Sequence, residues 1–320
     1  MSAVLSLSSN YYEALKRLTL ELAGVKLGAD HAFLIETRLS SLARDEGFDS
    51  LSEMIEELFK TGQSRLAVQV VSSLLERDTH FNTDLRSLNK LYDVIIPLLE
   101  PIHKNGTVRI LSFGCSSGQE PYCIAMALDK AKETYPHLNF EIVGVDYPSS
   151  ALDRARTGRY SHFDVQRGLP IRDLITYFDR DKEDWILKPE IRDKVTFKGT
   201  HLLSNLDQLG DFHVVLFRNA LPHYSSPAQV RVLRGLAGLV KPLGYLLLGS
   251  DETLNHINFG FDTLARQNGV FRKRPEKIEP EIEDPTIKKP NGRKTFERTK
   301  RKLKDMEDFK QAKLIQTKKK

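Results

Sequence analysis

Short apolar runs alternate with helical stretches between residues 108 and 248, and this alternation constrains the fold more than any other feature of the sequence. The apolar runs cover residues 108–113, 140–145, 195–197, 212–217 and 244–248. Nearly continuous apolar strands separated by helices are typical of a parallel sheet that helices cover on both faces. The sequence therefore predicts an α/β fold for this region.

The regions around this pattern have a different character. Before residue 105 there is no strand pattern, and apolar residues recur at helical spacing in stretches that begin near residues 10, 30, 50, 64 and 85. In residues 160–194, aromatic residues are spaced among charges without a long helical period, which favours a small antiparallel β-ribbon. We predict a helical domain over 1–95 and an α/β domain over 96–274 that contains this ribbon.

The charge of the chain is unevenly distributed. Of the 320 residues, the last 35 contain 14 Lys or Arg and 4 Asp or Glu, whereas the net charge of the whole chain is only +5. The basic character therefore belongs to a tail over 275–320, which we expect to be disordered or partly helical. The mildly acidic body gives no reason to expect a nucleic-acid site. A solubilising tail is the simplest interpretation, and contact of the tail with anionic lipid or nucleic acid is the alternative.

Several classes of protein are disfavoured by composition. There are only two cysteines, Cys115 and Cys123, and the nine histidines form no H-x-x-x-H or Cys/His cluster. No apolar run approaches the ~20 residues that span a bilayer, and no secretory signal pattern is present. We therefore expect a reduced cytoplasmic protein with no metal site and no membrane insertion.

The most informative stretch for function is residues 111–122, in which an apolar strand runs into Gly114 and Gly118 and then into a helix. This arrangement lets the backbone approach a ligand closely. Asp146 follows the next apolar run, where a carboxylate can hydrogen-bond a ribose diol. A tight turn without a ligand, and a helix cap at Asp146, are the structural alternatives.

The same glycines also spell G-x-S-x-G, with Ser116 in the place of a hydrolase nucleophile. An α/β-hydrolase normally builds several strands before its nucleophile strand, whereas only helical patterns precede this one. The hydrolase interpretation is therefore the weaker of the two.

Several separate motifs, taken in order, resemble the CheR-type chemotaxis-receptor methyltransferases over about residues 10–273. These motifs lie in residues 114–122, 144–146, 155–160, 168–170, 177–178, 212–219 and 241–250. The resemblance implies a small all-α domain, followed by a Rossmann-like S-adenosylmethionine-dependent methyltransferase domain with an inserted β-ribbon. It also implies methylation of glutamate side chains on the cytoplasmic helices of chemoreceptors, with S-adenosylhomocysteine as product. We expect the protein to be a monomer.

The resemblance also assigns cofactor-binding residues. It implies that Glu120 contacts the methionine ammonium group and that Asp146 contacts the ribose. The other residues implied in the cofactor pocket are Thr79, Thr83, Gly114, Ser116, Gly118, His201, Leu202, Arg218 and Asn219.

The chain departs from the family pattern near the transferable methyl group. The family motif Asn-Glu-Thr-x-Phe-Phe-Arg ends here at Thr83 instead of arginine, and His223 stands in place of a tyrosine. We therefore take His223, the neighbouring Tyr224 and Arg86 as catalytic candidates. These departures leave a second hypothesis open, a catalytically weakened relative that binds the cofactor and acts through protein contacts. At a further departure, His213 replaces an aspartate.

Overall fold

The computed structural model describes residues 8–28, 32–62, 64–75, 79–103, 106–200, 203–204, 206–254 and 257–275. The described residues form two compact units, one that ends at Leu75 and one within Glu76–Asp284. The tail predicted over 275–320 lies almost entirely outside the described residues.

The first unit is helical, as the sequence predicts. Its helices are α1 (Ser9–Ala23), α2 (Ala32–Asp45), α3 (Leu51–Thr61) and α4 (Ser64–Leu75). The start of α3 shows why the sequence folds this way locally. The Ser50 side chain accepts a hydrogen bond from the Glu53 N–H, and the Glu53 carboxylate accepts one from the Asp49 N–H. Buried apolar residues at helical spacing, such as Leu15, Leu18 and Leu58, form the core of this unit.

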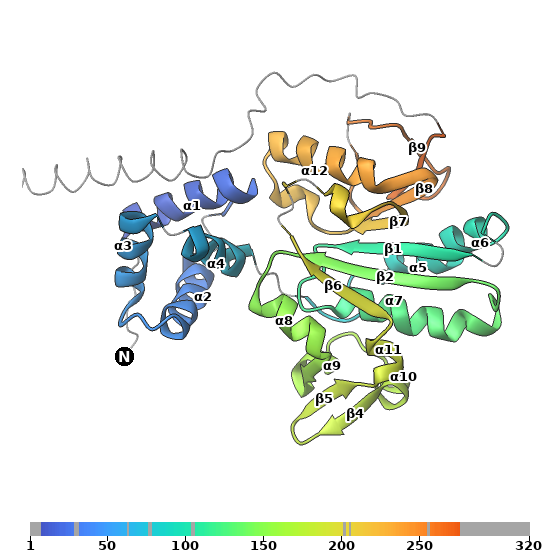
Figure 1. Ribbon diagram of the computed structural model, residues 1–320, viewed down its shortest axis with the longest axis horizontal. Coiled ribbons are helices and arrows are strands. Elements are labelled where there is room, and N and C mark those ends of the chain that lie inside the picture. Colours follow the sequence, from blue (N-terminus) through green and yellow to red (C-terminus); the bar gives the residue numbers. More distant parts are fainter. Residues whose placement is uncertain are drawn as a thin grey trace, which may run out of the picture. The chain divides into compact units, whose positions relative to one another are not determined.

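The second unit is built on a seven-stranded sheet in the order β6-β2-β1-β7-β8-β10-β9 (Figure 1). The strands are β1 (Thr107–Phe113), β2 (Asn139–Asp146), β6 (Val195–Gly199), β7 (Phe212–Phe217), β8 (Val240–Leu248), β9 (Phe261–Thr263) and β10 (Val270–Lys273). The first five strands are parallel, which confirms the α/β prediction. The antiparallel strands β9 and β10 were not predicted from the sequence.

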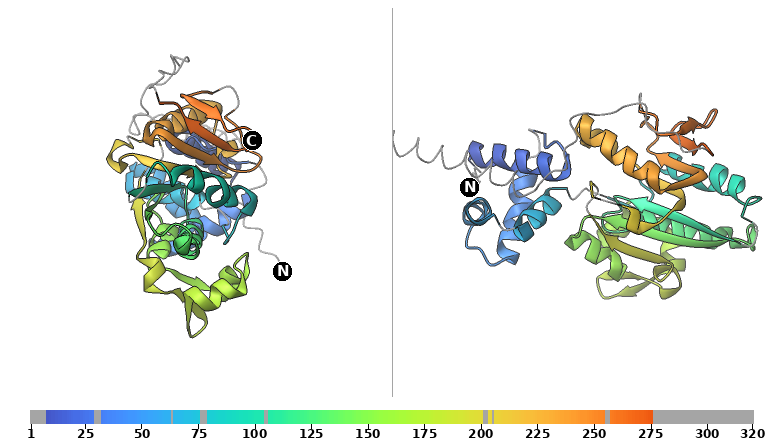
Figure 2. Two further views of the ribbon diagram at one scale, coloured as in Figure 1. Left: turned by 90° about the vertical axis from the view of Figure 1, so that its right-hand side faces the viewer. Right: turned by 45° about the horizontal axis from the view of Figure 1, so that its top comes forward.

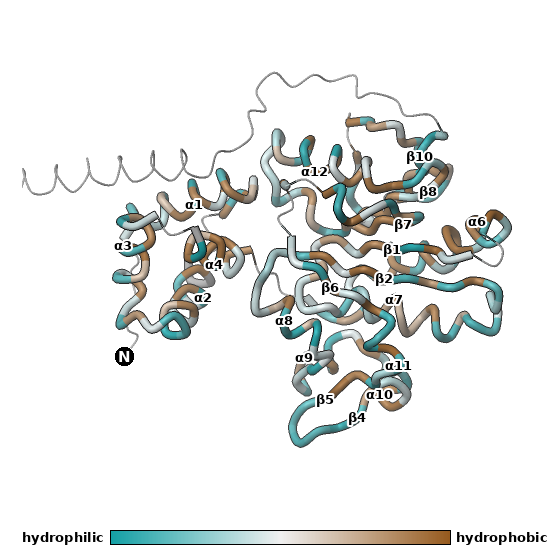
Figure 3. The backbone as a smooth tube through the Cα atoms, in the orientation of Figure 1, coloured by the Kyte–Doolittle hydropathy of each residue, from teal (hydrophilic) through white to brown (hydrophobic). Residues whose placement is uncertain are grey.

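Helices cover both faces of this sheet. From β1 the chain steps to β2 and then β6 through α7 (Gln119–Lys130) and α8 (Ser150–Thr157), but from β7 it steps the other way, to β8, through α12 (Ser226–Leu239). Right-handed crossovers in opposite directions place their helices on opposite faces. Short 3₁₀ turns lie at Ala131–Glu133, Asp207–Leu209 and Leu221–His223 (η3, η4, η5). Figure 3 shows the apolar residues concentrated along the central strands, and every residue of β7 is buried.

The segment predicted as an inserted ribbon forms a separate three-stranded antiparallel sheet in the order β3-β5-β4 (Figure 2). Its strands are β3 (Arg159–Ser161), β4 (Phe178–Asp181) and β5 (Asp184–Leu187), with short helices α9 (His162–Gln166), α10 (Ile171–Tyr177) and α11 (Pro189–Arg192). Tyr177 and Phe178 are buried and pack beneath the ribbon, Trp185 is partly buried, and Phe163 is exposed.

The boundary between the units falls earlier than the residue 95 predicted from the sequence. The segment α5 (Leu85–Lys90), a π-helical turn (Leu91–Ile95, η2) and α6 (Ile96–Leu99) belongs to the α/β unit, where Leu88, Leu91 and Ile95 join its core. Helical periodicity alone cannot tell which core an amphipathic helix covers. Pro97 explains the π turn, because it lacks the N–H that an α-helix would use there.

Candidate active site

The carboxyl ends of β1, β2 and β7 meet at one edge of the sheet, and the strand order reverses between β1 and β7. Ligands of open α/β sheets bind in the crevice at such a reversal. The loop after β1 is tied to the neighbouring strand by hydrogen bonds from the Gly114 and Cys115 N–H groups to the Val145 carbonyl, at 2.7 and 3.1 Å. This edge therefore carries the glycine loop that the sequence singled out.

The two glycines of the loop, Gly114 and Gly118, differ in what surrounds their backbone. Gly114 has a φ of +81°, and a Cβ placed on it would meet nothing within 4 Å, so open space lies beside its backbone. Gly118 also has a positive φ, but a Cβ there would lie 2.9 Å from the Ala155 Cβ. The close approach at Gly118 is therefore to the protein itself, and the open space beside Gly114 is what suits a ligand.

Asp146, at the end of β2, holds the loop in place. One carboxylate oxygen accepts the Ser116 N–H at 2.6 Å, and the other accepts the Tyr147 N–H at 2.6 Å. Ser116 has a φ of +48°, which costs a non-glycine residue about 1 kcal/mol or more. These two bonds fix the orientation of the Asp146 carboxylate at the carboxyl end of β2.

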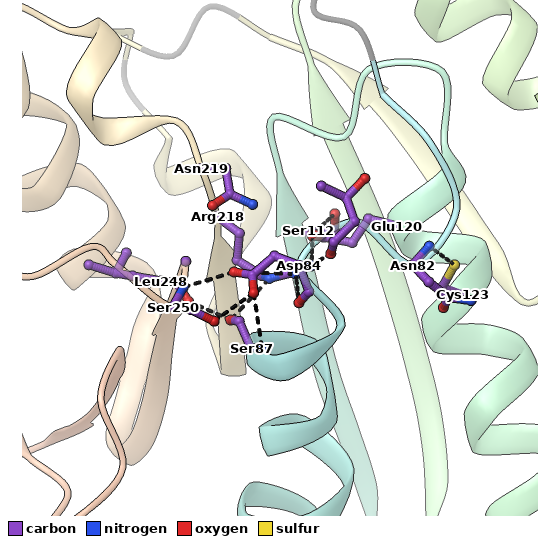
Figure 4. Close-up of polar contacts among 12 residues, drawn as sticks. Asn82, Asp84, Ser87, Ser112, Glu120, Cys123, Arg218, Asn219, Leu248 and Ser250 are labelled. Carbon is purple, nitrogen blue, oxygen red and sulfur yellow. Dashed lines mark hydrogen bonds and ion pairs between the residues drawn. The ribbon is translucent and has the colours of Figure 1, made fainter. Parts of the chain in front are cut away.

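Glu120, in the first turn of α7, is held between two side chains from neighbouring strands (Figure 4). The Ser112 hydroxyl of β1 donates to one carboxylate oxygen at 2.7 Å, and the Arg218 guanidinium, which follows β7, donates to the other at 2.5 Å. The Arg218 side chain is only 2% exposed, whereas that of Glu120 is 22% exposed. Glu120 is therefore positioned by a buried cation and still reaches solvent.

Arg218 connects this carboxylate to the segment that precedes α5 (Figure 4). Its guanidinium donates to the backbone carbonyls of Thr83 and Asp84 at 2.5 and 2.6 Å, and to the Ser87 hydroxyl at 3.1 Å. The fixed fork of guanidinium donors allows one side chain to satisfy acceptors from three elements. A change in the position of residues 83–87 is thus transmitted directly to Glu120.

Asp84 anchors the same segment to the end of β8. Its carboxylate accepts hydrogen bonds from the Ser250 N–H at 2.8 Å and the Ser250 hydroxyl at 2.6 Å. Partial burial by itself raises the pKa of Asp84, but the hydrogen bonds from Ser250 and the charge of Arg218 outweigh it and lower the pKa below its ordinary value. The carboxylate is therefore ionised at neutral pH and completes a polar link from β8 through Arg218 to Glu120.

The residues just before Asp84 are packed firmly into the α/β unit. The Phe81 ring lies 5.0 Å from that of Tyr160, centroid to centroid, and the Asn82 amide donates to the Gly168 carbonyl at 2.8 Å. A Cβ at Gly168 would lie only 2.0 Å from the Phe81 carbonyl oxygen, so a glycine is required there. The Asn82 N–H donates to the Cys123 sulfur at 3.3 Å, and burial raises the pKa of Cys123 to about 12.

Most of the other site residues predicted from the sequence are half-buried or exposed. The Thr83 hydroxyl donates to the His80 carbonyl, and Thr79 is half-buried. Arg86 is exposed on α5, and His223 is exposed at the end of η5. Asn219 is also exposed, with a φ of +55°, directly after Arg218.

Tyr224, in contrast, is buried, and its ring centroid lies 6.0 Å from that of Phe217. The catalytic roles of Arg86, His223 and Tyr224 stay predictions. His201 and Leu202 lie outside the described residues.

Sequence reasoning missed three polar side chains of this site: Ser112, Asp84 and the guanidinium of Arg218. Ser112 is a fully buried polar residue within an apolar strand, and this is the one signal that could have drawn attention to it. Among the described residues, no group of three or more His, Cys, Asp or Glu side chains is arranged to hold a metal ion. Within the same part of the chain, no helix is long and apolar enough to cross a bilayer.

The class of this protein follows from its parallel sheet, the open glycine loop and the two carboxylates beside the reversal of strand order. It is a Rossmann-like methyltransferase that binds S-adenosylmethionine. The family model "CheR methyltransferase, SAM binding domain" matches residues 77–270. The chain belongs to this CheR family.

Characterised relatives agree with this assignment. The chain is 33% identical over 260 residues to "Chemotaxis protein methyltransferase Cher2" of Pseudomonas putida, covering 80% of this chain and 94% of that protein. It is 32% identical to "Chemotaxis protein methyltransferase 1" of Pseudomonas aeruginosa, covering 78% and 92%. The chemotaxis protein methyltransferase of Escherichia coli is 26% identical, covering 82% and 90%. The comparisons do not favour the weakened, non-catalytic relative.

Proposed function

We propose that this protein transfers a methyl group from S-adenosylmethionine to glutamate side chains on the cytoplasmic helices of chemoreceptors, and that it does so in the cytoplasm as a monomer. The observation that carries the proposal is that the Glu120 carboxylate is bonded to Ser112 at the end of β1 and the Asp146 carboxylate to Ser116 in the glycine loop that follows, in a chain of the CheR family. The printed names of the relatives, chemotaxis protein methyltransferases, support the choice of pathway.

The residues at this edge suit the proposed donor. S-adenosylmethionine carries a sulfonium and an ammonium group, so carboxylates in its pocket are electrostatically favourable. Glu120 would hold the ammonium group, and the Asp146 carboxylate would accept hydrogen bonds from the two ribose hydroxyls. The open space beside Gly114 gives the cofactor room along the backbone. When bound, the donor supplies an electrophilic methyl group.

The chain's own residues then need to orient the reactants, not to move a proton. A glutamate acceptor has an unperturbed pKa of about 4.3, so it is already an ionised nucleophile at neutral pH and requires no general base. Alignment of the reacting groups and exclusion of water can supply the rate acceleration. His223, exposed after β7, is our candidate for contact with the acceptor, and Arg86 is our candidate for attracting the acceptor carboxylate.

The direct test uses the full chain, S-adenosylmethionine labelled in its methyl group, and purified cytoplasmic fragments of chemoreceptors. The proposal predicts label in the fragment that base releases as methanol, since a glutamate methyl ester is base-labile. Receptor fragments whose acceptor glutamates are replaced by alanine serve as the control and should stay unlabelled. Label that resists base, or label that is equal in both fragments, would contradict methylation of glutamate.

A further inference from the structure

Glu252, four residues after the end of β8, is a buried carboxylate with an unusual set of partners. It is 7% exposed, and among the described residues all its hydrogen-bond donors are backbone N–H groups. One oxygen accepts from Gly249 at 2.7 Å and from Asn219 at 2.8 Å. The other accepts from Ala220 and from Leu221, both at 2.9 Å. Four donors use the full acceptor capacity of the carboxylate.

These four hydrogen bonds join two loops that follow neighbouring strands. Residues 219–221 follow β7, and Gly249 follows β8. Hydrogen bonds to an ionised acceptor are roughly twice as strong as those between neutral groups, so the carboxylate clamps the loop after β7 to the end of β8. No residue larger than glycine fits at position 249, because a Cβ there would lie too close to Asn219 Oδ1 and 2.8 Å from Glu252 Oε2.

The hydrogen bonds to Glu252 help to hold Asn219 in a left-handed backbone conformation. Asn219 has a φ of +55°, in the left-handed region, which asparagine tolerates better than other non-glycine residues and which surrounding contacts further stabilise. The bond from the Asn219 N–H to Glu252 is one of these contacts. Asn219 adjoins Arg218, whose guanidinium holds Glu120 at 2.5 Å. The loop that Glu252 fixes thus begins at the cofactor edge and continues into η5 with His223.

We propose that Glu252 is a positioning residue for cofactor binding. It fixes the backbone of residues 219–221 so that Asn219 faces the cofactor in its bound conformation, without touching the cofactor itself. The inference rests on the proposed function, since it assigns Glu252 a role in the same site. Its consequence is that loss of the carboxylate weakens cofactor binding even when the protein remains folded.

The test compares Glu252→Gln with Asp251→Asn, a matched change of charge at the exposed neighbouring residue. Glutamine keeps one acceptor oxygen and places an NH₂ group, which cannot accept, against two backbone N–H groups. We expect binding of S-adenosylhomocysteine, measured by calorimetry well below the unfolding temperature, to weaken at least 10-fold in Glu252→Gln. It should stay within twofold of wild type in Asp251→Asn. Hydrogen exchange at Asn219, Ala220, Leu221 and Gly249 should accelerate at least 10-fold only in Glu252→Gln.

A third variant separates positioning from loss of stability. Leu236→Ala removes a buried side chain from α12 and lowers the unfolding temperature without touching the clamp, so its affinity should stay within twofold of wild type. If Glu252→Gln does not fold, Glu252→Asp is judged by the same criterion. A folded Glu252 variant that binds the product within twofold of wild type overturns the inference. A wild-type protein that binds no product would instead contradict the proposed function.

Discussion

At the scale of single residues, the Asp146 carboxylate fixes the Ser116 backbone, and our proposal gives it a second role as an acceptor for the ribose hydroxyls. We predict that Asp146→Ala weakens binding of S-adenosylhomocysteine by about 10- to 100-fold, which corresponds to about 1.4–2.8 kcal/mol. Calorimetric titration of the full chain measures this directly. Asp153→Asn, which removes a surface carboxylate on α8 that pairs with Arg156, is the control and should bind normally. Equal affinities of the two variants would remove Asp146 from the site.

The ion pair between Arg218 and Glu120 gives a prediction about stability. Arg218→Met leaves the carbonyls of Thr83 and Asp84 without this donor and the Glu120 carboxylate with only the Ser112 hydroxyl. Breaking a fully buried pair from one side costs about 3–5 kcal/mol, and because Glu120 still reaches solvent we expect a loss of about 2–3 kcal/mol and a lower midpoint of urea unfolding. Arg156→Met, which breaks an exposed pair, should cost less than about 1 kcal/mol. Similar midpoints for the two variants would show that the Arg218 network contributes little.

The sequence predicted Glu120 and Asp146 but not the contacts that hold them. Both residues belong to local motifs, a glycine loop entering a helix and the end of an apolar strand, which can be read along the chain. The bond between Glu120 and Arg218 joins residues 98 positions apart and exists only because β1 and β7 are neighbours. Nothing in the local pattern of Arg218 or Glu252 indicates which distant atoms they reach.

At the scale of elements, periodicity predicted the parallel strands and the ribbon but missed β9 and β10. The central strand β7 is buried along its whole length, whereas β9 is three residues long with two exposed positions. β10 is four residues long, and its second half consists of the charged residues Arg272 and Lys273. Strands this short are specified by their pairing, β10 with β8 and β9 with β10, which depends on tertiary structure.

We predict that His213, near the start of β7, makes the free energy of unfolding depend on pH in the acid range. Its ring lies 4.3 Å from that of His103, and its Nδ1 accepts the Arg109 N–H at 2.9 Å, while Lys241 lies 3.3 Å from Nε2. Burial, and then the charges of Lys241 and its neighbours, lower the pKa of His213 to about 4. Because the unfolded chain binds this proton more readily, with an ordinary pKa of about 6.5, the free energy of unfolding should fall as the pH drops from 6.5 to 4.

Urea unfolding measured across this pH range tests the prediction. We expect a loss of about 2 kcal/mol after allowance for solvent screening. His213→Asp places a carboxylate beside Lys241 and Arg109 and should flatten the pH dependence, whereas His137→Asp, at an exposed histidine, should leave it as in wild type. If His213→Asp retains the full acid sensitivity, another group is responsible for it.

At the scale of the whole molecule, the candidate cofactor residues that the structure describes all lie in the unit over Glu76–Asp284. Saturating S-adenosylhomocysteine should therefore slow hydrogen exchange at residues 114–118 and 219–221. The amides in the core of α1–α4 should exchange at an unchanged rate. A ligand at 100 times its Kd stabilises the unit that binds it by about 2.7 kcal/mol, which such an experiment resolves easily. Protection that appears instead in the helical unit would place the cofactor elsewhere.

The crystal structure of the full chain with S-adenosylhomocysteine is the most decisive measurement. We predict the product at the carboxyl edge of β1 and β2, with its ribose hydroxyls within hydrogen-bond distance of Asp146. Its ammonium group should contact the Glu120 carboxylate while Arg218 still supports that carboxylate from the other side. A product molecule bound away from both carboxylates, with Gly114 facing solvent, would contradict this site.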